Sequence, residues 1–354
     1  MESILKEFKP NLIPNNLKSE VTDFDKIILK NGGYLKYFYL KKKDGCRLEL
    51  IDGEVLSRAL KAPGSQLVVD RFKPIAEEFK KLNILVEGEF YMHGLKFNSI
   101  FRFFSKENVE NPKYRLELEK ALKKDPEKFF KEYETTDIDF LTTFHSELKL
   151  HIFDCIILDR PDLTGFLERV AEMVRRVFKS CLPGDSHIVL PDIQLVESKE
   201  HLDSTYQQSL DEGYEGLILV HRDHEYKFGR NSLNQGTLLK MKEDSLEYDG
   251  IILDVLEGTS VKEGVETTID NLGYSETSKK KDDRESSGLA KGFLVEYEDK
   301  GTFTVGLGSF DNTQKRELLI NKELYIGKNF KYTGMKPVKD YPRHAFFQCW
   351  RDEK

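Results

Sequence analysis

The chain has 354 residues, of which 39% are hydrophobic and 33% are charged, and its formal net charge is −7. This composition is ordinary for a globular protein, and the length favours two domains. No apolar run is long enough to cross a membrane, the first ten residues lack the apolar stretch of a secretory signal, and the four cysteines contain no Cys-x-x-Cys pair typical of a zinc ribbon. An acidic total does not exclude a nucleic-acid partner, but the binding face must then be a local basic patch.

The first part of the chain is predicted to combine strands with helices. A helix over 21–29 ends at an Asn-Gly-Gly turn, and apolar strands over 34–40 and 47–51 flank a polar turn. Apolar residues at helical spacing predict a helix over 69–81, and a β-prone run predicts a strand over 84–91.

Strands and helices alternate in the middle of the chain. A charged stretch over 108–134, broken at Asp125-Pro126, is expected to form a helical insertion on the surface. The other expected elements are strands over 148–158, 188–195, 214–220 and 238–242, and helices over 164–180 and 201–211.

The pattern changes after Lys242, where a polar linker is followed mainly by strands. We therefore predict one domain over 1–245 and a second over 246–354. Many short strands in the second domain favour a small barrel. Residues 260–289 are polar and carry the run Lys-Lys-Lys-Asp-Asp-Arg, so we expect a long charged loop there.

The run 42–47, Lys-Lys-Asp-Gly-Cys-Arg, is the first candidate site. A lysine amine is a nucleophile only when it is deprotonated, and nearby cations and desolvation favour that form. Lys41, Lys43 and Arg47 crowd Lys42, and the same cations suit a polyphosphate ligand. The plainer interpretation is a solvated hairpin turn, because Asp-Gly is a strong hairpin signal.

Charged residues in apolar strands form a second candidate group. A buried carboxylate needs a partner, and Glu89 and Glu215 lie in or beside predicted strands. Lys240 and Lys242 project to one face of a strand. Two ammonium groups side by side repel each other unless an anion lies nearby. Lysines that protect an edge strand from pairing give the same pattern. The whole group favours a polyanion site with a divalent metal, and its members are Lys42, Arg47, Arg58, Glu89, Glu215, Lys240 and Lys242.

Taken in order, these motifs resemble those of the covalent nucleotidyltransferase superfamily, and within it the compact, phage-type ATP-dependent DNA ligases. The run 42–47 is similar to the nucleophile motif of this family, Lys-x-Asp-Gly-x-Arg, and Glu87 replaces the aspartate of its Asp-Gly-Glu motif. The resemblance covers nearly the whole chain. The other similar stretches are Ser57-Arg58, Phe153-Asp154, Glu215-Gly216, Lys240-Met241-Lys242, Val305-Gly306-Leu307-Gly308 and the terminal Arg351-Asp352-Glu353-Lys354.

The resemblance implies an α+β fold, in which an antiparallel-sheet nucleotidyltransferase (adenylation) domain is followed by a small β-barrel, the OB-fold domain. It also implies an ATP-dependent DNA ligase that seals nicks in duplex DNA. Lys42 would attack the α-phosphate of ATP to form lysyl-AMP, AMP would pass to the 5′-phosphate at the nick, and the 3′-hydroxyl would then displace AMP. Mg²⁺, with Mn²⁺ as an alternative, would offset the phosphate charge.

The family motifs further imply a role for each candidate residue. Glu89 and Glu215 would contact metal or ribose, Phe153 would stack on adenine, and Arg58 would serve the ribose or the DNA 5′-phosphate. The loop over 260–289 would either clasp duplex DNA or serve only as a linker. The remaining cations would hold phosphate: Arg47, Lys240 and Lys242 in the first domain, and Arg351 and Lys354, which would orient pyrophosphate when the barrel closes.

Three alternatives remain open at this point. An mRNA-capping guanylyltransferase shares the lysine, the barrel and the terminal motif, an RNA ligase usually lacks the barrel, and a duplex-DNA-binding remnant of the fold would have lost the chemistry. The Val-Gly-x-Gly strand and the intact lysines favour the ligase. We also expect a monomer, since no coiled-coil repeat is visible, in the cytoplasm, which would be that of an infected bacterial host if the chain is phage-encoded.

Overall fold

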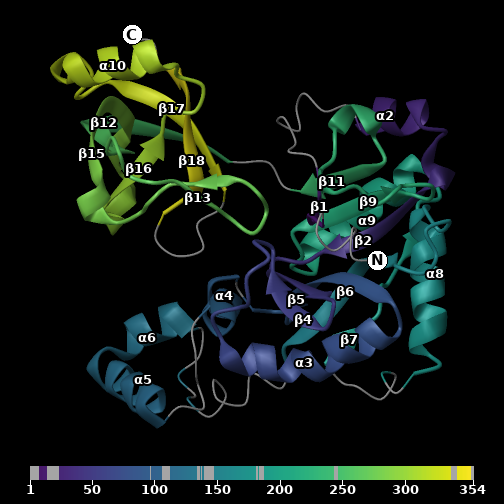
Figure 1. Ribbon diagram of the computed structural model, residues 1–354. Coiled ribbons are helices and arrows are strands. Elements are labelled where there is room, and N and C mark those ends of the chain that lie inside the picture. Colours follow the sequence, from purple (N-terminus) through teal and green to yellow (C-terminus); the bar gives the residue numbers. More distant parts are fainter. Residues whose placement is uncertain are drawn as a thin grey trace. The chain divides into compact units, whose positions relative to one another are not determined.

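The computed structural model describes residues 8–13, 24–95, 97–105, 112–133, 136, 138, 147–180, 182, 187–242, 246–335 and 341–351. The chain divides into two compact units, Met1–Glu243 and Asp244–Lys354 (Figure 1). Among the helices described in these ranges, none is long and apolar enough to cross a membrane.

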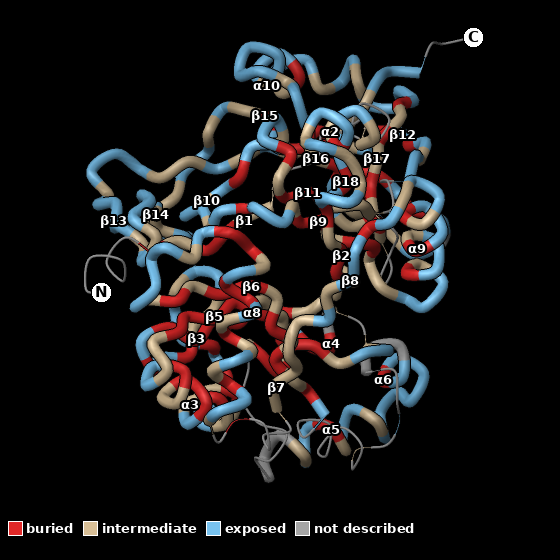
Figure 2. The backbone as a smooth tube through the Cα atoms, turned by 90° about the vertical axis from the view of Figure 1, so that its right-hand side faces the viewer, coloured by how far each residue is buried: buried red, intermediate tan, exposed pale blue. Residues whose placement is uncertain are grey.

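The larger sheet of the first unit is antiparallel except at one edge. Its strands lie in the order β4 (Glu54–Ser57), β3 (Cys46–Ile51), β5 (Ile84–Tyr91), β6 (Lys149–Ile157) and β7 (Ile188–Val189), and only the β6–β7 pair is parallel. Helices α3 (Gln66–Lys81) and α8 (Phe166–Val177) bury their apolar faces against these strands, where buried residues concentrate (Figure 2). The α3 face is the one that the helical spacing of its apolar residues predicted.

The second sheet of this unit packs on both of its faces. Its strands lie in the order β11 (Leu238–Lys242), β9 (Gly216–His221), β2 (Tyr37–Lys42) and β8 (Gln194–Leu195). Alternate side chains of a strand point to opposite faces. Leu217 and Leu219 therefore pack with α2 (Phe24–Lys30) and α9 (Lys199–Asp211), whereas Ile218 and Val220 join the core of the larger sheet.

Several short elements complete the first unit. Strand β1 (Asn11–Leu12) pairs in parallel with β10 (Gly229–Arg230). The charged insertion forms two helices that meet at Asp125, as predicted, because the Asp125 side chain accepts a hydrogen bond from the Lys128 N–H at 2.9 Å. Other helices within the described residues of this unit are α4 (Phe97–Ser105), α5 (Pro112–Lys124), α6 (Pro126–Tyr133), η2 (Tyr34–Lys36) and η5 (Leu233–Gln235).

The second unit is a closed barrel. Its strands lie in the order β12 (Leu246–Val261), β15 (Arg284–Glu296), β16 (Thr302–Gly306), β18 (Arg343–Trp350) and β17 (Asn329–Met335). Buried aromatic rings, among them Phe293 and Phe330, fill its interior. Helix α10 (Asn312–Ile320) and the short helices η6 (Lys281–Asp283), η7 (Glu298–Lys300) and η8 (Lys322–Leu324) connect the strands. An α+β domain followed by an OB-fold barrel is therefore confirmed.

Two predicted elements differ from the observed ones. The strand over 188–195 is split into β7 and β8, which belong to different sheets, because Pro191 lacks the N–H that a continuing ladder needs. The prediction of a long loop over 260–289 was wrong for much of that segment. Strand β12 extends to Val261, and β15 begins at Arg284. Between them, β13 (Thr268–Ile269) pairs with β14 (Ser275–Glu276). Strands that are largely solvated carry little apolar alternation, which is why the sequence suggested a loop.

Helix α10 was not predicted, although its start carries a signal. Asp311 accepts a hydrogen bond from the Gln314 N–H at 2.8 Å, and the Gln314 side chain accepts one from the Asp311 N–H at 2.9 Å. This capping box was visible in the sequence as Asp-x-x-Gln.

Candidate active site

Lys42 is the last residue of β2, and its amine contacts a carboxylate. Its Nζ forms an ion pair with Glu215 Oε2, and the Glu215 N–H donates to the Lys42 carbonyl at 2.9 Å. Both side chains are partly buried, with 22% and 19% of their surfaces exposed. The pairing of β2 with β9 thus places the predicted nucleophile beside one of the two predicted carboxylates.

Strand β11, which carries the lysine pair, is separated from β2 by β9. Lys42 and Lys242 are both in register with Gly216 of β9, which lies between their strands, and Lys240 is in register with Ile218. Burial, together with the charges of Lys242, Lys42 and Arg230, lowers the pKa of Lys240 to about 8. Strand β11 is an edge strand, as the plainer interpretation required, but the clustering of cations around Lys240 indicates a site for an anion.

The larger sheet carries a second group of candidate residues. Arg47 on β3, Glu89 on β5 and His151 on β6 are in register, and Phe153 follows on β6. Burial raises the pKa of Glu89 to about 7. The charge of Glu215 also raises this pKa, whereas the charges of Lys42 and Arg47 lower it. Glu89 therefore lies within the electrostatic reach of both Lys42 and Glu215.

Arg47 is held by protein groups on three sides. Its Nη2 lies 2.7 Å from Glu87 Oε1 and donates to the Asn11 carbonyl at 2.9 Å, and its Nε lies 3.1 Å from Glu49 Oε1. The guanidinium lies 5.1 Å from the centre of the Phe153 ring. Part of the donor capacity of Arg47 is thus used within the protein, which the sequence did not suggest.

Two cavities meet at Lys42. The first, of about 350 Å³, is lined by apolar groups that include Leu40, Phe153 and Ile218, together with Lys42, Arg47 and Glu89. The volume is that expected of a small-molecule site, and a lining that combines apolar side chains with many charged ones suits a ligand with both kinds of group. The second cavity, of about 530 Å³, also contains Lys42, Arg47 and Glu89, and is otherwise lined by Arg58, Arg230, Lys240, Phe97 and Phe101, among others.

Arg58, in the turn after β4, faces only the second cavity. Burial and the charges of Arg47 and Arg230 lower its pKa. Arg230 was missed by sequence reasoning, because only the pairing of β10 with β1 brings it to the site. Glu49 was also missed, although it lies in the apolar run Leu-Glu-Leu and carries the signal that identified Glu89.

The two candidates near the C-terminus belong to the second unit. The Arg351 Nε donates to Asp249 Oδ1 at 2.6 Å, and Arg351 is exposed. Lys354 lies outside the described residues. The roles of these two residues therefore stay predictions.

The donors near Lys42 fit a magnesium ion. Within the part of the chain that the structure describes, no group of three or more His, Cys, Asp or Glu side chains could hold a metal by itself. Mg²⁺ in nucleotide sites takes one or two carboxylates and completes its shell with water and substrate phosphates. Glu89 and Glu215 are two such carboxylates, facing the cluster of lysines.

Comparison with known proteins identifies the family. Residues 17–242, more than half of the chain, match the family model for the ATP dependent DNA ligase domain. No curated protein sequence matches the chain.

Solved structures resemble the chain in fold. A structure named "Pmar-Lig_PreS3" matches with a TM-score of 0.61 and 17% identity, over 97% of this chain and 67% of that chain. A structure from a study of Lig E DNA ligases matches with a TM-score of 0.56 and 18% identity, over 91% and 95% of the two chains. Chlorella virus DNA ligase-adenylate matches with a TM-score of 0.46 and 21% identity, over 98% and 99%. By the match over 17–242, the chain belongs to the family of ATP-dependent DNA ligases.

Proposed function

We propose that the protein seals nicks in duplex DNA, as a monomer, through an AMP carried on Lys42. The observation that carries this proposal is the position of Lys42 where the two cavities meet. The smaller cavity, which combines apolar side chains with charged and polar ones, suits adenosine, with Phe153 stacking on adenine. The larger cavity contains Arg58, Arg230 and Lys240 and suits the phosphate at a DNA end.

Each step of the reaction exchanges one bond to phosphorus for another. Lys42 Nζ loses a proton, for which Glu215 is the carboxylate in contact, and attacks the α-phosphorus of ATP, so that an N–P bond forms and pyrophosphate leaves. A 5′-phosphate oxygen of the nick then attacks the same phosphorus and releases the lysine. Finally, the 3′-hydroxyl attacks the 5′-phosphorus, the phosphodiester forms and AMP leaves.

The chain's charged groups have distinct tasks in this scheme. Lys240 and Lys242 neutralise the α-phosphate, and Arg47, fixed by Glu87, contacts the ribose or phosphate edge of the nucleotide. Arg351 and Lys354 orient pyrophosphate in the ATP step. Glu89 and Glu215 would hold Mg²⁺, or Mn²⁺ in its place, which supplies charge stabilisation to the phosphate oxygens when bound.

The test is transfer of label from α-labelled ATP, with α-labelled GTP in parallel, each with and without Mg²⁺. We expect label from ATP to stay on the denatured protein, to require Mg²⁺, to be absent in Lys42→Ala and to leave the protein when nicked DNA is added. Lys36→Ala, an exposed lysine outside both cavities, is the matched control and should label like the wild type.

Other outcomes would overturn the proposal in identifiable ways. Label from GTP alone would favour a capping enzyme, and label that leaves only on nicked RNA would favour an RNA ligase. No label from either nucleotide, with Mn²⁺ also tried, would leave a DNA-binding protein without this chemistry.

A further inference from the structure

Residues 8–13, which we call the N-terminal strap, contribute to both cavities at the candidate site. Asn11 and Ile13 line the smaller cavity, and Leu12 and Ile13 line the larger one. The strap lies outside residues 17–242, the part of the chain that carries the family match. Family membership therefore assigns no role to it.

The backbone of the strap holds two arginines of the site. The Asn11 carbonyl accepts a hydrogen bond from Arg47 Nη2 at 2.9 Å, and the Ile13 carbonyl accepts one from Arg230 Nη1 at 3.0 Å. Both arginines line the larger cavity, and Arg47 lines the smaller one as well. The strap thus supplies one of the contacts that direct each guanidinium group, and Arg47 is held by Glu87 and Glu49 as well.

The Asn11 side chain anchors the strap to both sheets. It is 5% exposed, its Oδ1 accepts from Asn231 Nδ2, and its Nδ2 lies 3.4 Å from Asp154 Oδ2 and 3.2 Å from His224 Nε2. Asp154 lies on β6 directly after Phe153, whereas His224 and Asn231 belong to the connection between β9 and β11. Asn11 therefore joins the sheet that carries Phe153 to the sheet that carries the lysines.

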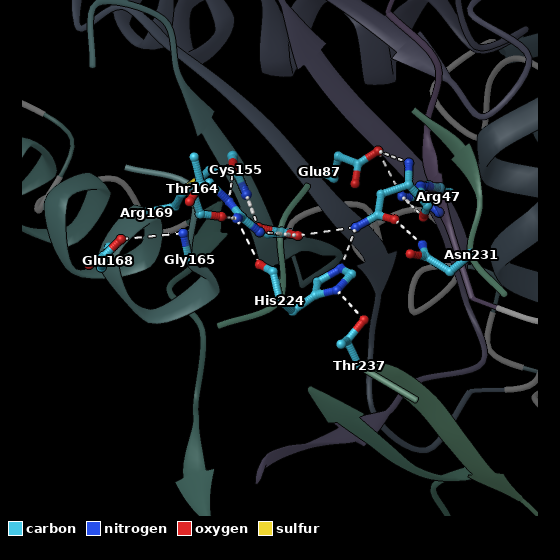
Figure 3. A network of polar contacts seen from close by, with 12 residues as sticks. Arg47, Glu87, Cys155, Thr164, Gly165, Glu168, Arg169, His224, Asn231 and Thr237 are labelled. Carbon is cyan, nitrogen blue, oxygen red and sulfur yellow. Dashed lines mark hydrogen bonds and ion pairs between the residues drawn. The ribbon is translucent and has the colours of Figure 1, made fainter. Parts of the chain in front are cut away.

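The partners of Asn11 are themselves fixed (Figure 3). Asp154 accepts hydrogen bonds from Arg169 Nη2 at 3.0 and 3.1 Å, and Arg169 also donates to the His224 carbonyl at 3.0 Å. Burial lowers the pKa of His224 to about 4, so this ring is neutral near pH 7. Its Nε2 can then accept from Asn11 while its Nδ1–H donates to Thr237 Oγ1 at 3.0 Å.

We propose that Asn11 is a positioning residue of the ligase reaction, which acts by fixing the strap that orients Arg47 and Arg230. This inference rests on the proposed function, since it names the groups that the strap positions for ATP and for the DNA end. A backbone carbonyl cannot be substituted directly, so the Asn11 side chain is the means of releasing the strap. Its backbone N–H, which donates to Glu87 Oε1 at 3.2 Å, remains in any non-proline variant.

Asn11→Ala tests the proposal with two separate readouts. The ATP concentration that half-saturates labelling of Lys42 should rise about tenfold, because a small displacement of positioning groups costs that much. Transfer of AMP from the labelled protein to nicked DNA, measured in a single turnover, should slow by about the same factor. The fraction of protein that becomes labelled at saturating ATP should equal that of the wild type.

A merely structural role gives a different pattern. It would lower the labelled fraction and leave both the ATP dependence and the transfer rate of the remaining protein unchanged, and that result would overturn the proposal. Wild-type values for all three quantities would overturn it too. Failure of the proposed function is separate, because then the wild type itself takes no label.

Two further variants complete the test. Asn31→Ala removes a side chain that donates to the Ile27 carbonyl at 2.8 Å, outside both cavities, and should behave as the wild type. If Asn11→Ala does not fold, Asn231→Ala removes the donor to Asn11 Oδ1 but keeps the Asn231 N–H bond to the Leu12 carbonyl at 2.8 Å. It should move both readouts in the same direction, and wild-type values in that variant would refute the role of the strap.

Discussion

Arg47 is shared by two buried carboxyl groups, Glu49 and Glu87, whose side chains are 0% and 2% exposed. Burial and the charge of a neighbouring carboxylate both disfavour ionisation, so one guanidinium does not keep two adjacent buried carboxyl groups ionised. Burial, with the charge of Glu87, raises the pKa of Glu49 to about 9. Near pH 7, Glu49 is therefore neutral. Burial also raises the pKa of Glu87, against the charge of Arg47, whose Nη2 lies 2.7 Å from Glu87 Oε1.

Glu49→Gln should remove a pH dependence of stability. Folded Glu49 holds its proton up to about pH 9, whereas in the unfolded chain it ionises near 4.5, so the wild-type free energy of unfolding falls as pH rises between these values. Glutamine does not titrate. The free energy of unfolding of the variant, relative to that of the wild type, should therefore rise by at most about 1.4 kcal/mol per pH unit over this window. Urea unfolding at several pH values across it measures the difference.

The matched control is Glu54→Gln, a glutamate at the start of β4 whose side chain is 63% exposed. Its unfolding curves should shift with pH as those of the wild type do. Parallel pH profiles for Glu49→Gln and the wild type would show that Glu49 is ionised in the folded protein.

At the scale of elements, the site depends on the close approach of β9 and β11. Gly216 opens β9 with a φ of +135°, and a Cβ there would lie 2.1 Å from the Met241 carbonyl oxygen. Gly216→Ala should force the strands apart and move Lys240 and Lys242 away from Lys42. We expect labelling by ATP to fall about a hundredfold and the free energy of unfolding to fall by about 3 kcal/mol.

Gly213→Ala separates this packing effect from backbone strain. Gly213 also has a positive φ, +88°, but a Cβ there meets nothing within 4 Å. Its replacement should cost only about 1 kcal/mol and leave labelling intact. Equal losses of labelling in the two variants would mean that strain, and not the approach to Met241, matters at Gly216.

Elements with a strong apolar period were predictable, and those fixed by distant contacts were not. The spacing of Phe72, Ile75 and Phe79 located α3, and Lys240 falls on the predicted strand over 238–242. Lys42 was expected in the turn after the strand over 34–40, but it is the last residue of β2. Strand β1 has two residues, too few for any periodicity. Its place is fixed by bonds such as that from Asn231 to Asn11, which are 220 positions apart, so no local pattern could indicate it.

At the scale of the whole molecule, the motifs of the ligase family are divided between the two units. Lys42, Glu89 and Glu215 belong to the first unit, whereas Arg351 belongs to the barrel. If Arg351 orients pyrophosphate, it is needed only while ATP reacts, since the later steps contain no pyrophosphate. A lysine already carrying AMP, or a nick already carrying AMP, should not require it.

Arg351→Ala should therefore separate the steps of the reaction. Labelling by ATP is expected to fall by about a hundredfold or more, because charge stabilisation of a leaving group contributes that much, while sealing of a pre-adenylated nick should proceed at the wild-type rate. Arg351 also pairs with Asp249 of β12, so the loss could instead reflect this contact within the barrel. Asp249→Ala removes the same contact and keeps the guanidinium, and it should label as the wild type does. If Asp249→Ala lost labelling to the same extent, or if Arg351→Ala also stopped the sealing of the pre-adenylated nick, Arg351 would serve the barrel and not the ATP step.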